Sequence, residues 1–285
     1  MIPVLFEIGP IKIYSYGLML GIGFLLGSYV LSLEFKRKGI NPNLASNITI
    51  IALIFGIAGA KLLYLIENWS AFIQAPIDMA FAAGGLTWYG GFFLGLVAVV
   101  LYVRAKKVPL LKFLDALGIA LLLAYGIGRL GCHFSGDGDY GFPTDLPWGT
   151  NYEKGTYPPD RAFRIFYESE EMRRLYPEII EKFPHGVPAN TPCHPTPVYE
   201  MLLGVAGFCL MWFWLRKKPY PDGKLFALYL VLSSVFRFSV EFLRLNPRLL
   251  FGLSEAQLFS AVLFLVGVVW ILRLNAKPSS PASGS

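Results

Sequence analysis

Seven long apolar runs restrict the fold of this chain more than any other feature. They fall at roughly 14–33, 48–66, 86–104, 113–130, 196–215, 223–241 and 256–273. A helix of about 20 apolar residues matches the hydrocarbon core of a bilayer. Of the 285 residues, 55% are hydrophobic and 15% are charged, and a soluble domain of this length cannot enclose so much apolar surface. We therefore predict an all-α polytopic membrane protein with about seven transmembrane helices.

The basic residues between these runs predict an orientation. They gather after the first, third, fifth and seventh runs, so all four clusters share one side of the membrane if seven runs span it. Cytoplasmic loops carry an excess of Lys and Arg, which predicts an outer N-terminus and a cytoplasmic C-terminus. The same clusters account for the formal net charge of +6, which is therefore no indication of nucleic-acid binding.

The remaining segments complete the predicted organisation. We expect a single transmembrane domain over 1–275 with an outer-side head segment at about 131–195, because so long a connection usually carries structure or function. The tail, 276–285, is rich in Ser, Pro and Ala and is predicted to be disordered. The sequence ahead of the first run has neither a basic region nor a small-residue cleavage site, so we expect this run to be a retained helix.

Arginines within or beside the runs are the strongest indication of chemistry. Arg129 ends the fourth run, and the spacing of Arg237, Glu241 and Arg244 places them on one helical face. An arginine in hydrocarbon is costly, so it is normally paired or lines a polar cavity. A guanidinium can bind two oxygens of a lipid phosphate. A structural ion pair between Arg237 and Glu241 and a polar cavity that also includes Arg129 both stay open.

Metal binding is not predicted. Asp137 and Asp139 alternate in a Gly-rich segment, but the terminal Glu of a calcium loop is absent. Cys132, Cys193 and Cys209 show no metal-ligand spacing. Cys132 and Cys193 both fall on the predicted outer side, where a disulfide is chemically permitted, and their pairing stays open.

Three further motifs bring polar groups to the ends of the runs. Tyr16 opens the first run, and Tyr89 lies between paired glycines in the third. His194, Tyr199 and Glu200 surround the start of the fifth. Each motif has a structural alternative, namely an interface anchor for the tyrosine, close helix packing for the glycines, and a capped helix start for the last motif.

Taken in order, these motifs resemble those of the bacterial phosphatidylglycerol:prolipoprotein diacylglyceryl transferases. The resemblance runs from Tyr16 to Gln257, and seven spans with an outer N-terminus also match that family. The most specific matches are Gly128-Arg129-Leu130-Gly131, His194-Pro195-Thr196 with Tyr199-Glu200, and Arg237-Phe238 with Glu241-Phe242 and Arg244. The chain is a divergent member by this comparison.

Four positions carry the divergence. Tyr89 stands where the best-known members have His, and Cys132 stands where they have Asn. Asp137 replaces a Glu, with about one residue inserted before Gly141, and Pro197 stands where Gln is usual.

The resemblance implies a reaction and its partners. A diacylglyceryl group would move from phosphatidylglycerol to the thiol of the lipobox cysteine of a preprolipoprotein, forming a thioether and releasing glycerol 1-phosphate. The expected location is the bacterial cytoplasmic (inner) membrane. The expected partners are phosphatidylglycerol, the lipobox-containing signal peptide of the preprolipoprotein and membrane lipids, with no nucleic acid, metal or cofactor.

The resemblance also assigns residues. The expected catalytic residues are Tyr89, Arg129, His194, Arg237 and Glu241. The expected substrate-binding residues are Tyr16, Arg129, Asp137, Gly141, Tyr199, Glu200 and Arg244. Arg129 and Arg237 would bind the phosphate and Glu241 would orient Arg237. Tyr16 and Tyr89 would contact the glyceryl headgroup or the thiol proton, with His194 as a second group for proton handling.

Two alternatives stay open. A non-catalytic phospholipid-binding or lipid-handling protein of the same fold would keep the arginines and lose the transfer, and the departures at Tyr89 and Cys132 favour it. A transporter would show inverted repeats or broken helices in corresponding halves, and the sequence indicates neither.

Overall fold

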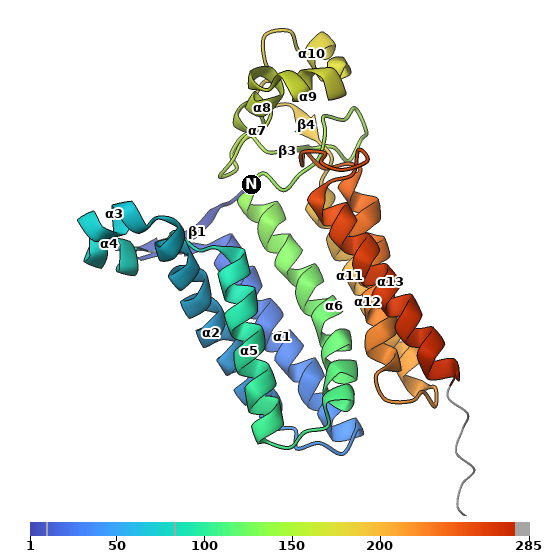
Figure 1. The fold of residues 1–285 in the computed structure, drawn as a ribbon. Coiled ribbons are helices and arrows are strands. Elements are labelled where there is room, and N and C mark those ends of the chain that lie inside the picture. Colours follow the sequence, from blue (N-terminus) through green and yellow to red (C-terminus); the bar gives the residue numbers. More distant parts are fainter. Residues whose placement is uncertain (10, 83, 277–285) are drawn as a thin grey trace, which may run out of the picture. The chain divides into compact units, whose positions relative to one another are not determined.

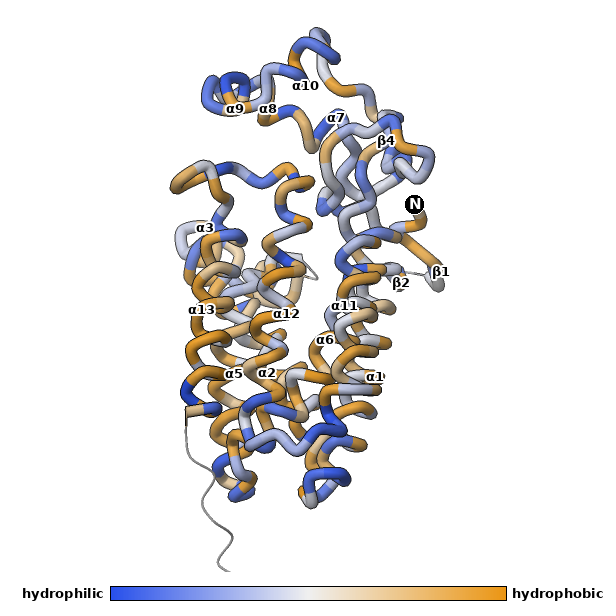
Figure 2. The backbone as a smooth tube through the Cα atoms, turned by 90° about the vertical axis from the view of Figure 1, so that its right-hand side faces the viewer, coloured by the Kyte–Doolittle hydropathy of each residue, from blue (hydrophilic) through white to orange (hydrophobic). Residues whose placement is uncertain are grey.

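A computed structural model describes residues 1–9, 11–82 and 84–276, and seven long helices dominate these residues (Figure 1). They are α1 (Ser15–Arg37), α2 (Leu44–Glu67), α5 (Trp88–Ala105), α6 (Leu110–Ser135), α11 (Thr196–Phe213), α12 (Lys224–Glu241) and α13 (Glu255–Ala276). Each coincides with one predicted run. Figure 2 shows them hydrophobic along most of their length and hydrophilic near their ends. The predicted all-α polytopic membrane fold is confirmed.

The sixth predicted span, α12, differs from the others in composition. Within the described residues, six helices are long and apolar enough to cross a membrane, and α12 is not among them. Its 18 residues include the charged side chains Lys224, Arg237 and Glu241. Because α12 packs along α13 and α11, these charges have protein neighbours in place of lipid, as polar groups at membrane depth require.

The chain divides into two compact units. The first comprises Met1–Gly27 with Gly118–Ser285, and the second comprises Ser28–Leu117. The single transmembrane domain expected over 1–275 stays a prediction. The tail expected to be disordered, 276–285, lies outside the described residues apart from Ala276, which ends α13.

The second unit is held together by glycines on α2 and α5. A Cβ on Gly59 would clash with the carbonyl oxygen of Gly90 and lie 2.6 Å from the Cβ of Leu94. Gly91 meets the carbonyl oxygen of Gly56 in the same way, at 2.8 Å from an added Cβ. Small residues allow backbones to approach closely where lipid supplies no hydrophobic driving force. Two short helices, α3 (Trp69–Gln74) and α4 (Pro76–Phe81), connect α2 to α5.

Gly59→Ala is expected to destabilise the protein in detergent by about 1–3 kcal/mol, because an overpacked contact forces the two helices apart. The measurement is the temperature of heating after which only half of the protein still elutes as a monodisperse peak in size-exclusion chromatography. Gly21→Ala on α1 is the matched control, since a Cβ there meets nothing within 4 Å. Equal midpoints for the two variants would contradict the packing argument.

The first unit carries two features that the apolar runs do not predict. Ahead of α1, β1 (Val4–Ile8) and β2 (Ile11–Tyr14) form an antiparallel hairpin. The predicted head segment folds around short helices and the two-stranded antiparallel pair β3 (Thr150–Asn151) and β4 (Pro192–Cys193). Its helices are α7 (Pro159–Ala162), α8 (Arg164–Glu168), α9 (Glu170–Leu175) and α10 (Pro177–Lys182).

The head segment has a small aromatic core of its own. Its buried members are Tyr140, Tyr152, Phe163, Phe166, Met172, Ile179, Val187 and Cys193. Tyr140 and Tyr152 stack at 4.3 Å between ring centroids. Cys132 and Cys193 are both buried free thiols, so the disulfide left open by the sequence is not formed. The core explains how a segment without a long apolar run becomes ordered.

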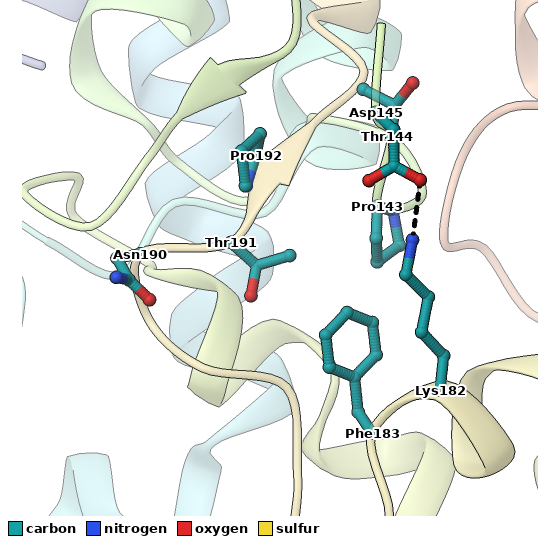
Figure 3. Close-up of a pocket in the computed structure, with 8 residues that line it drawn as sticks. All are labelled: Pro143, Thr144, Asp145, Lys182, Phe183, Asn190, Thr191 and Pro192. Atoms are coloured by element: carbon teal, nitrogen blue, oxygen red, sulfur yellow. Dashed lines mark hydrogen bonds and ion pairs between the residues drawn. The ribbon is translucent and has the colours of Figure 1, made fainter.

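A pocket of about 270 Å³ lies in the head segment, lined by Pro143, Thr144, Asp145, Lys182, Phe183, Asn190, Thr191 and Pro192 (Figure 3). The carboxylate of Asp145 and the ammonium of Lys182 approach to 2.9 Å on one side of it. In the described part of the chain, none of the residues expected to be functional lines this pocket. The residues expected to be functional therefore lie elsewhere.

Candidate functional site

Six charged side chains of the first unit form one ion-pair network, which we call the arginine cluster. Its members are Arg129, Asp139, Glu200, Arg237, Glu241 and Arg244. They come from the C-terminal part of α6 and the loop after it, the start of α11, and the end of α12 with the residues just beyond it. These ends of α6, α11 and α12 lie beside the head segment (Figure 1).

Glu200 is the centre of the cluster. Its carboxylate lies 3.0 Å from Nε of Arg129 and 2.8 Å from a terminal guanidinium nitrogen of Arg237. Arg244 approaches it to 3.3 Å, and the hydroxyl of Tyr125 donates a hydrogen bond of 2.7 Å. Glu200 is only 2% exposed. A buried carboxylate needs such partners, because an unpaired charge away from water is expensive.

Glu241 holds the α12 side of the cluster. Its carboxylate pairs with Arg237 at 2.9 Å, one helical turn away, as the spacing predicts. Ser254 donates a hydrogen bond of 2.8 Å to it, and the amide of Asn246 donates another. The ion pair left open by the sequence is therefore present, and it is one edge of a larger polar arrangement.

Asp139 closes the cluster on the side of the loop. One carboxylate oxygen contacts Arg129 and the other contacts Arg244. Burial opposes the negative charge, but the guanidiniums of Arg244 and Arg129 outweigh it and hold the pKa of Asp139 below its usual value. Asp139 is therefore ionised at neutral pH. The hydroxyl of Thr196 fixes the loop by donating to the backbone carbonyl of Asp139 at 2.6 Å.

The cluster balances three guanidiniums against three carboxylates. Guanidiniums bind carboxylates and phosphates through several parallel N–H donors, and these charge-assisted bonds are the strong ones. Donors fixed before a reaction and kept away from bulk water stabilise developing negative charge most effectively. Chemically, the arrangement suits the binding of a phosphate ester and the stabilisation of a phosphate leaving group.

Comparison with known proteins decides the family. The family described as prolipoprotein diacylglyceryl transferase matches residues 3–273. This chain belongs to the prolipoprotein diacylglyceryl transferase family. A relative named phosphatidylglycerol–prolipoprotein diacylglyceryl transferase from Clostridium tetani is 32% identical over 270 residues, covering 94% of this chain and 96% of its own length.

Two further relatives with that name support the assignment. The protein of Corynebacterium efficiens is 32% identical over 96% of this chain and 82% of its own length. The protein of Synechococcus elongatus is 30% identical over 96% of this chain and 88% of its own length. The resemblance recognised from the motifs is therefore confirmed for the family.

Within this transferase, five of the expected site residues meet in the arginine cluster, namely Arg129, Glu200, Arg237, Glu241 and Arg244. Gly141 lies beside it, and its backbone N–H donates to the carbonyl of His194 at 2.9 Å. A Cβ on Gly141 would clash with the carbonyl oxygen of Leu243. Glycine is thus needed there for the close approach of two backbone segments.

His194 and Tyr199 form a separate polar group with a residue of the head. The indole N–H of Trp148 donates to the hydroxyl of Tyr199 at 2.8 Å, and that hydroxyl lies 3.2 Å from Nδ1 of His194. Burial lowers the pKa of His194 below its usual value. His194 is therefore neutral at neutral pH and has a ring nitrogen able to accept a proton.

The remaining expected residues are placed as follows. Tyr16 lies in the first turn of α1 in the first unit, where its backbone packs against Gly131 of α6, 3.2 Å from an added Cβ. Tyr89 belongs to the second unit, at the start of α5, and its ring packs edge-on against Trp88. Tyr89 is half-exposed, and its catalytic role stays a prediction.

Asp137 lies close to Cys132 and Asp139, with potential ligand atoms within 4.8 Å of one another. Both carboxylate oxygens of Asp139 already contact guanidiniums. These positive charges oppose the binding of a metal cation at the same place. The charges around these three residues therefore disfavour a metal ion there.

Tyr125 is the main residue that sequence reasoning missed. Its hydroxyl donates to Glu200, and the guanidinium of Arg129 lies 5.0 Å from the centre of its ring. A cation over an aromatic face is attracted electrostatically. The available signal was its spacing, because a residue four positions before Arg129 lies on the same helical face.

Lys61 holds the segment that leads to Tyr89 within the second unit. Its ammonium donates to the backbone carbonyls of Ala82 at 2.9 Å and Gly84 at 2.8 Å. The ammonium also lies 5.6 Å from the centre of the Tyr64 ring. The charge that interrupts the second apolar run is thus used to fix the entry to α5.

Lys61→Met is expected to lower kcat for the transferase by roughly tenfold or more, because two charge-assisted hydrogen bonds to the segment before Tyr89 are lost. Lys61→Arg should restore most of the rate, since it keeps the charge and the donors. Turnover of a lipobox peptide measures both, with the exposed Lys217→Met as control. A full rate for Lys61→Met would show that the segment needs no such anchor.

Proposed function

We propose that this transferase moves the diacylglyceryl group of phosphatidylglycerol to the thiol of the lipobox cysteine of preprolipoproteins, the first step of lipoprotein maturation. The family match over residues 3–273 supports the activity. The structural observation that carries it is the set of three arginines gathered on the buried carboxylate of Glu200. Such a set is suited to an anionic phosphate at membrane depth.

The chemistry exchanges one bond for another. The thiol sulfur attacks the glyceryl carbon that carries the phosphate, the carbon–oxygen bond breaks, and glycerol 1-phosphate leaves. The thiol proton passes to a base or to the leaving phosphate. A thiol with a pKa of about 8.5 is only partly ionised at neutral pH, so proton removal assists the attack.

The residues take complementary roles in this proposal. Arg129 and Arg237 bind the phosphate and stabilise the charge that develops on the leaving group. Glu241 orients Arg237, and Glu200 orients both arginines. Arg244 contributes a third guanidinium to the same phosphate.

Proton handling falls to groups outside the arginine cluster. His194, neutral at neutral pH because burial lowers its pKa, is able to accept the thiol proton. Tyr16 and Tyr89 contact the glyceryl headgroup or the thiol. A phenol titrates near pH 10, so Tyr89 requires a neighbouring charge to act as a base. Asp137 and Tyr199 line the polar end of the substrate path.

The proposed location follows from the fold and the family. The protein spans the bacterial cytoplasmic (inner) membrane several times, with its N-terminus outside and its C-terminus in the cytoplasm. Its proposed partners are phosphatidylglycerol, the lipobox-containing signal peptide and the surrounding membrane lipids. No cofactor takes part in the proposed reaction.

Purified protein in detergent, with phosphatidylglycerol and a lipobox peptide, tests the proposal. The expected result is release of glycerol 1-phosphate together with a peptide mass gain of one diacylglyceryl group. A peptide with Ala in place of the lipobox cysteine is the control and should gain no mass. Phosphatidylglycerol binding that depends on Arg129, without any mass gain, would favour a lipid-handling protein of the same fold instead.

A further inference from the structure

Asp139 differs from the other two carboxylates of the arginine cluster in its accessibility. The side chains of Glu200 and Glu241 are 1% and 0% exposed, whereas the side chain of Asp139 is 31% exposed. Glu200 and Glu241 each belong to a long helix, and Asp139 belongs to the loop after α6. Of these three anions, Asp139 is the one whose side chain already reaches solvent and lies outside a helix.

The contacts of Asp139 have the geometry of a bound phosphate. Each of its two carboxylate oxygens contacts a different guanidinium, that of Arg129 or that of Arg244. The two non-bridging oxygens of a phosphodiester can make the same pair of contacts, because guanidiniums bind carboxylates and phosphates in the same way. Arg237 also acts on Asp139 electrostatically.

The loop allows the side chain to move while its backbone stays fixed. Gly136 and Gly138 have φ angles of +57° and +92°, a region that favours glycine. The backbone of Asp139 is anchored by Thr196, whose hydroxyl donates to its carbonyl. A rotation of the Asp139 side chain is therefore sufficient to vacate the space between the two arginines.

The charge of the cluster favours a phosphate that replaces Asp139 over one that binds in addition to it. The cluster is neutral as it stands, with three guanidiniums and three carboxylates. A phosphodiester carries one negative charge, as an ionised carboxylate does. If Asp139 kept its place when the phosphate entered, the buried cluster would gain an uncompensated negative charge, which is costly away from water.

We infer that Asp139 occupies the phosphate position in the free protein and is displaced when the phosphate group of phosphatidylglycerol binds between Arg129 and Arg244. This inference rests on the proposed function. After transfer, the return of the carboxylate to the two guanidiniums competes with glycerol 1-phosphate and promotes its release. Asp139 is thus a positioning residue that sets substrate affinity and product release.

The test is Asp139→Asn in the full chain, with glycerol 1-phosphate as the probe in a calorimetric titration. We expect the Kd to fall by about tenfold, because the ligand no longer displaces charge-assisted bonds. The KM for phosphatidylglycerol should fall with it, while kcat stays the same or falls as product release slows. A higher Kd and KM would overturn the inference, because Asp139 would then only orient the arginines.

Two control variants distinguish the loss of the contacts between Asp139 and its two arginines from the mere loss of a negative charge. Asp137→Asn removes one carboxylate from the same loop without breaking an arginine contact, and we expect a shift in Kd several times smaller. Asp145→Asn alters an exposed carboxylate of the head that pairs with Lys182, and it should leave both constants unchanged. An equal shift for Asp137→Asn would contradict a specific role of Asp139.

A measurement on the unaltered protein covers the case in which Asp139→Asn does not fold. In protein labelled with ¹³C-aspartate, binding of glycerol 1-phosphate should shift an aspartate carboxylate stretch in the infrared difference spectrum. Saturated binding without such a shift would overturn the inference. Binding is read without turnover, so a wild-type protein that binds the probe and transfers nothing would count against the proposed function alone.

Discussion

Replacing Arg129 by Ala is expected to abolish diacylglyceryl transfer, with kcat/KM falling by at least about a thousandfold, as for loss of a main stabiliser of developing charge. The guanidinium of Arg129 contacts Asp139 and Glu200 and lies over the ring of Tyr125. Without it, the leaving phosphate loses a fixed donor, and two carboxylates of the cluster lose a partner. Release of glycerol 1-phosphate from phosphatidylglycerol with a lipobox peptide measures the loss.

Arg129→Lys refines this test. Lysine keeps the positive charge but lacks the planar fork, so it cannot contact Glu200 and a phosphate together. We expect the rate of Arg129→Lys to lie between those of the unaltered protein and Arg129→Ala, and closer to that of Arg129→Ala. Arg164→Ala is the control, because Arg164 pairs with Glu168 on the exposed surface of the head. Near-normal turnover of Arg129→Ala in folded protein would remove Arg129 from the proposed mechanism.

The long helices could be predicted because their signal is local. Each apolar run is continuous along the chain, and bilayer thickness alone converts it into a helix. The pair of Arg237 and Glu241 could be predicted for a similar reason, since helical spacing joins them. The hairpin of β1 and β2 and the head segment have no such signal. Their contacts, such as the stacking of Tyr140 on Tyr152, join residues that no short pattern relates.

Most residues of the candidate site could be predicted from the sequence, but most of the ion pairs that join them could not. Arg129, Glu200 and Arg237 were recognised from separate motifs, but their meeting on one carboxylate depends on how α6, α11 and α12 pack. Asp139 is not among the expected site residues, and the sequence around it predicts no metal site. Its neighbours in space are Arg129 and Arg244, and no local pattern in the sequence relates Asp139 to them.

The different roles proposed for the three carboxylates of the cluster follow from how deeply each one is buried. Carboxylates fixed on helices hold the arginines in place at all times, so the guanidiniums do not need to reorganise when substrate arrives. A carboxylate on a loop neutralises the remaining charge until the phosphate replaces it. The head segment supplies that loop, which gives a structural reason for a folded head beside the membrane helices.

Glu200→Gln is expected to cost about 3 kcal/mol or more of stability and to stop the transfer, because it removes the buried carboxylate that three arginines share. The amide of Gln keeps the size of the side chain, but its NH₂ group faces guanidinium donors and it carries no charge. Arg129, Arg237 and Arg244 would then repel one another with only two carboxylates among them. The temperature midpoint of monodisperse elution measures the stability, and peptide turnover measures the activity.

Glu168→Gln gives the comparison for this experiment. Glu168 also pairs with an arginine, Arg164, but both side chains are exposed, and exposed ion pairs contribute little. We expect its midpoint and turnover to match those of the unaltered protein. If Glu200→Gln behaved in the same way, the arginines would not depend on Glu200 for their positions. The guanidiniums that bind the lipid phosphate would then be oriented by groups other than Glu200. Glu241, which pairs with Arg237, would be the next carboxylate to replace.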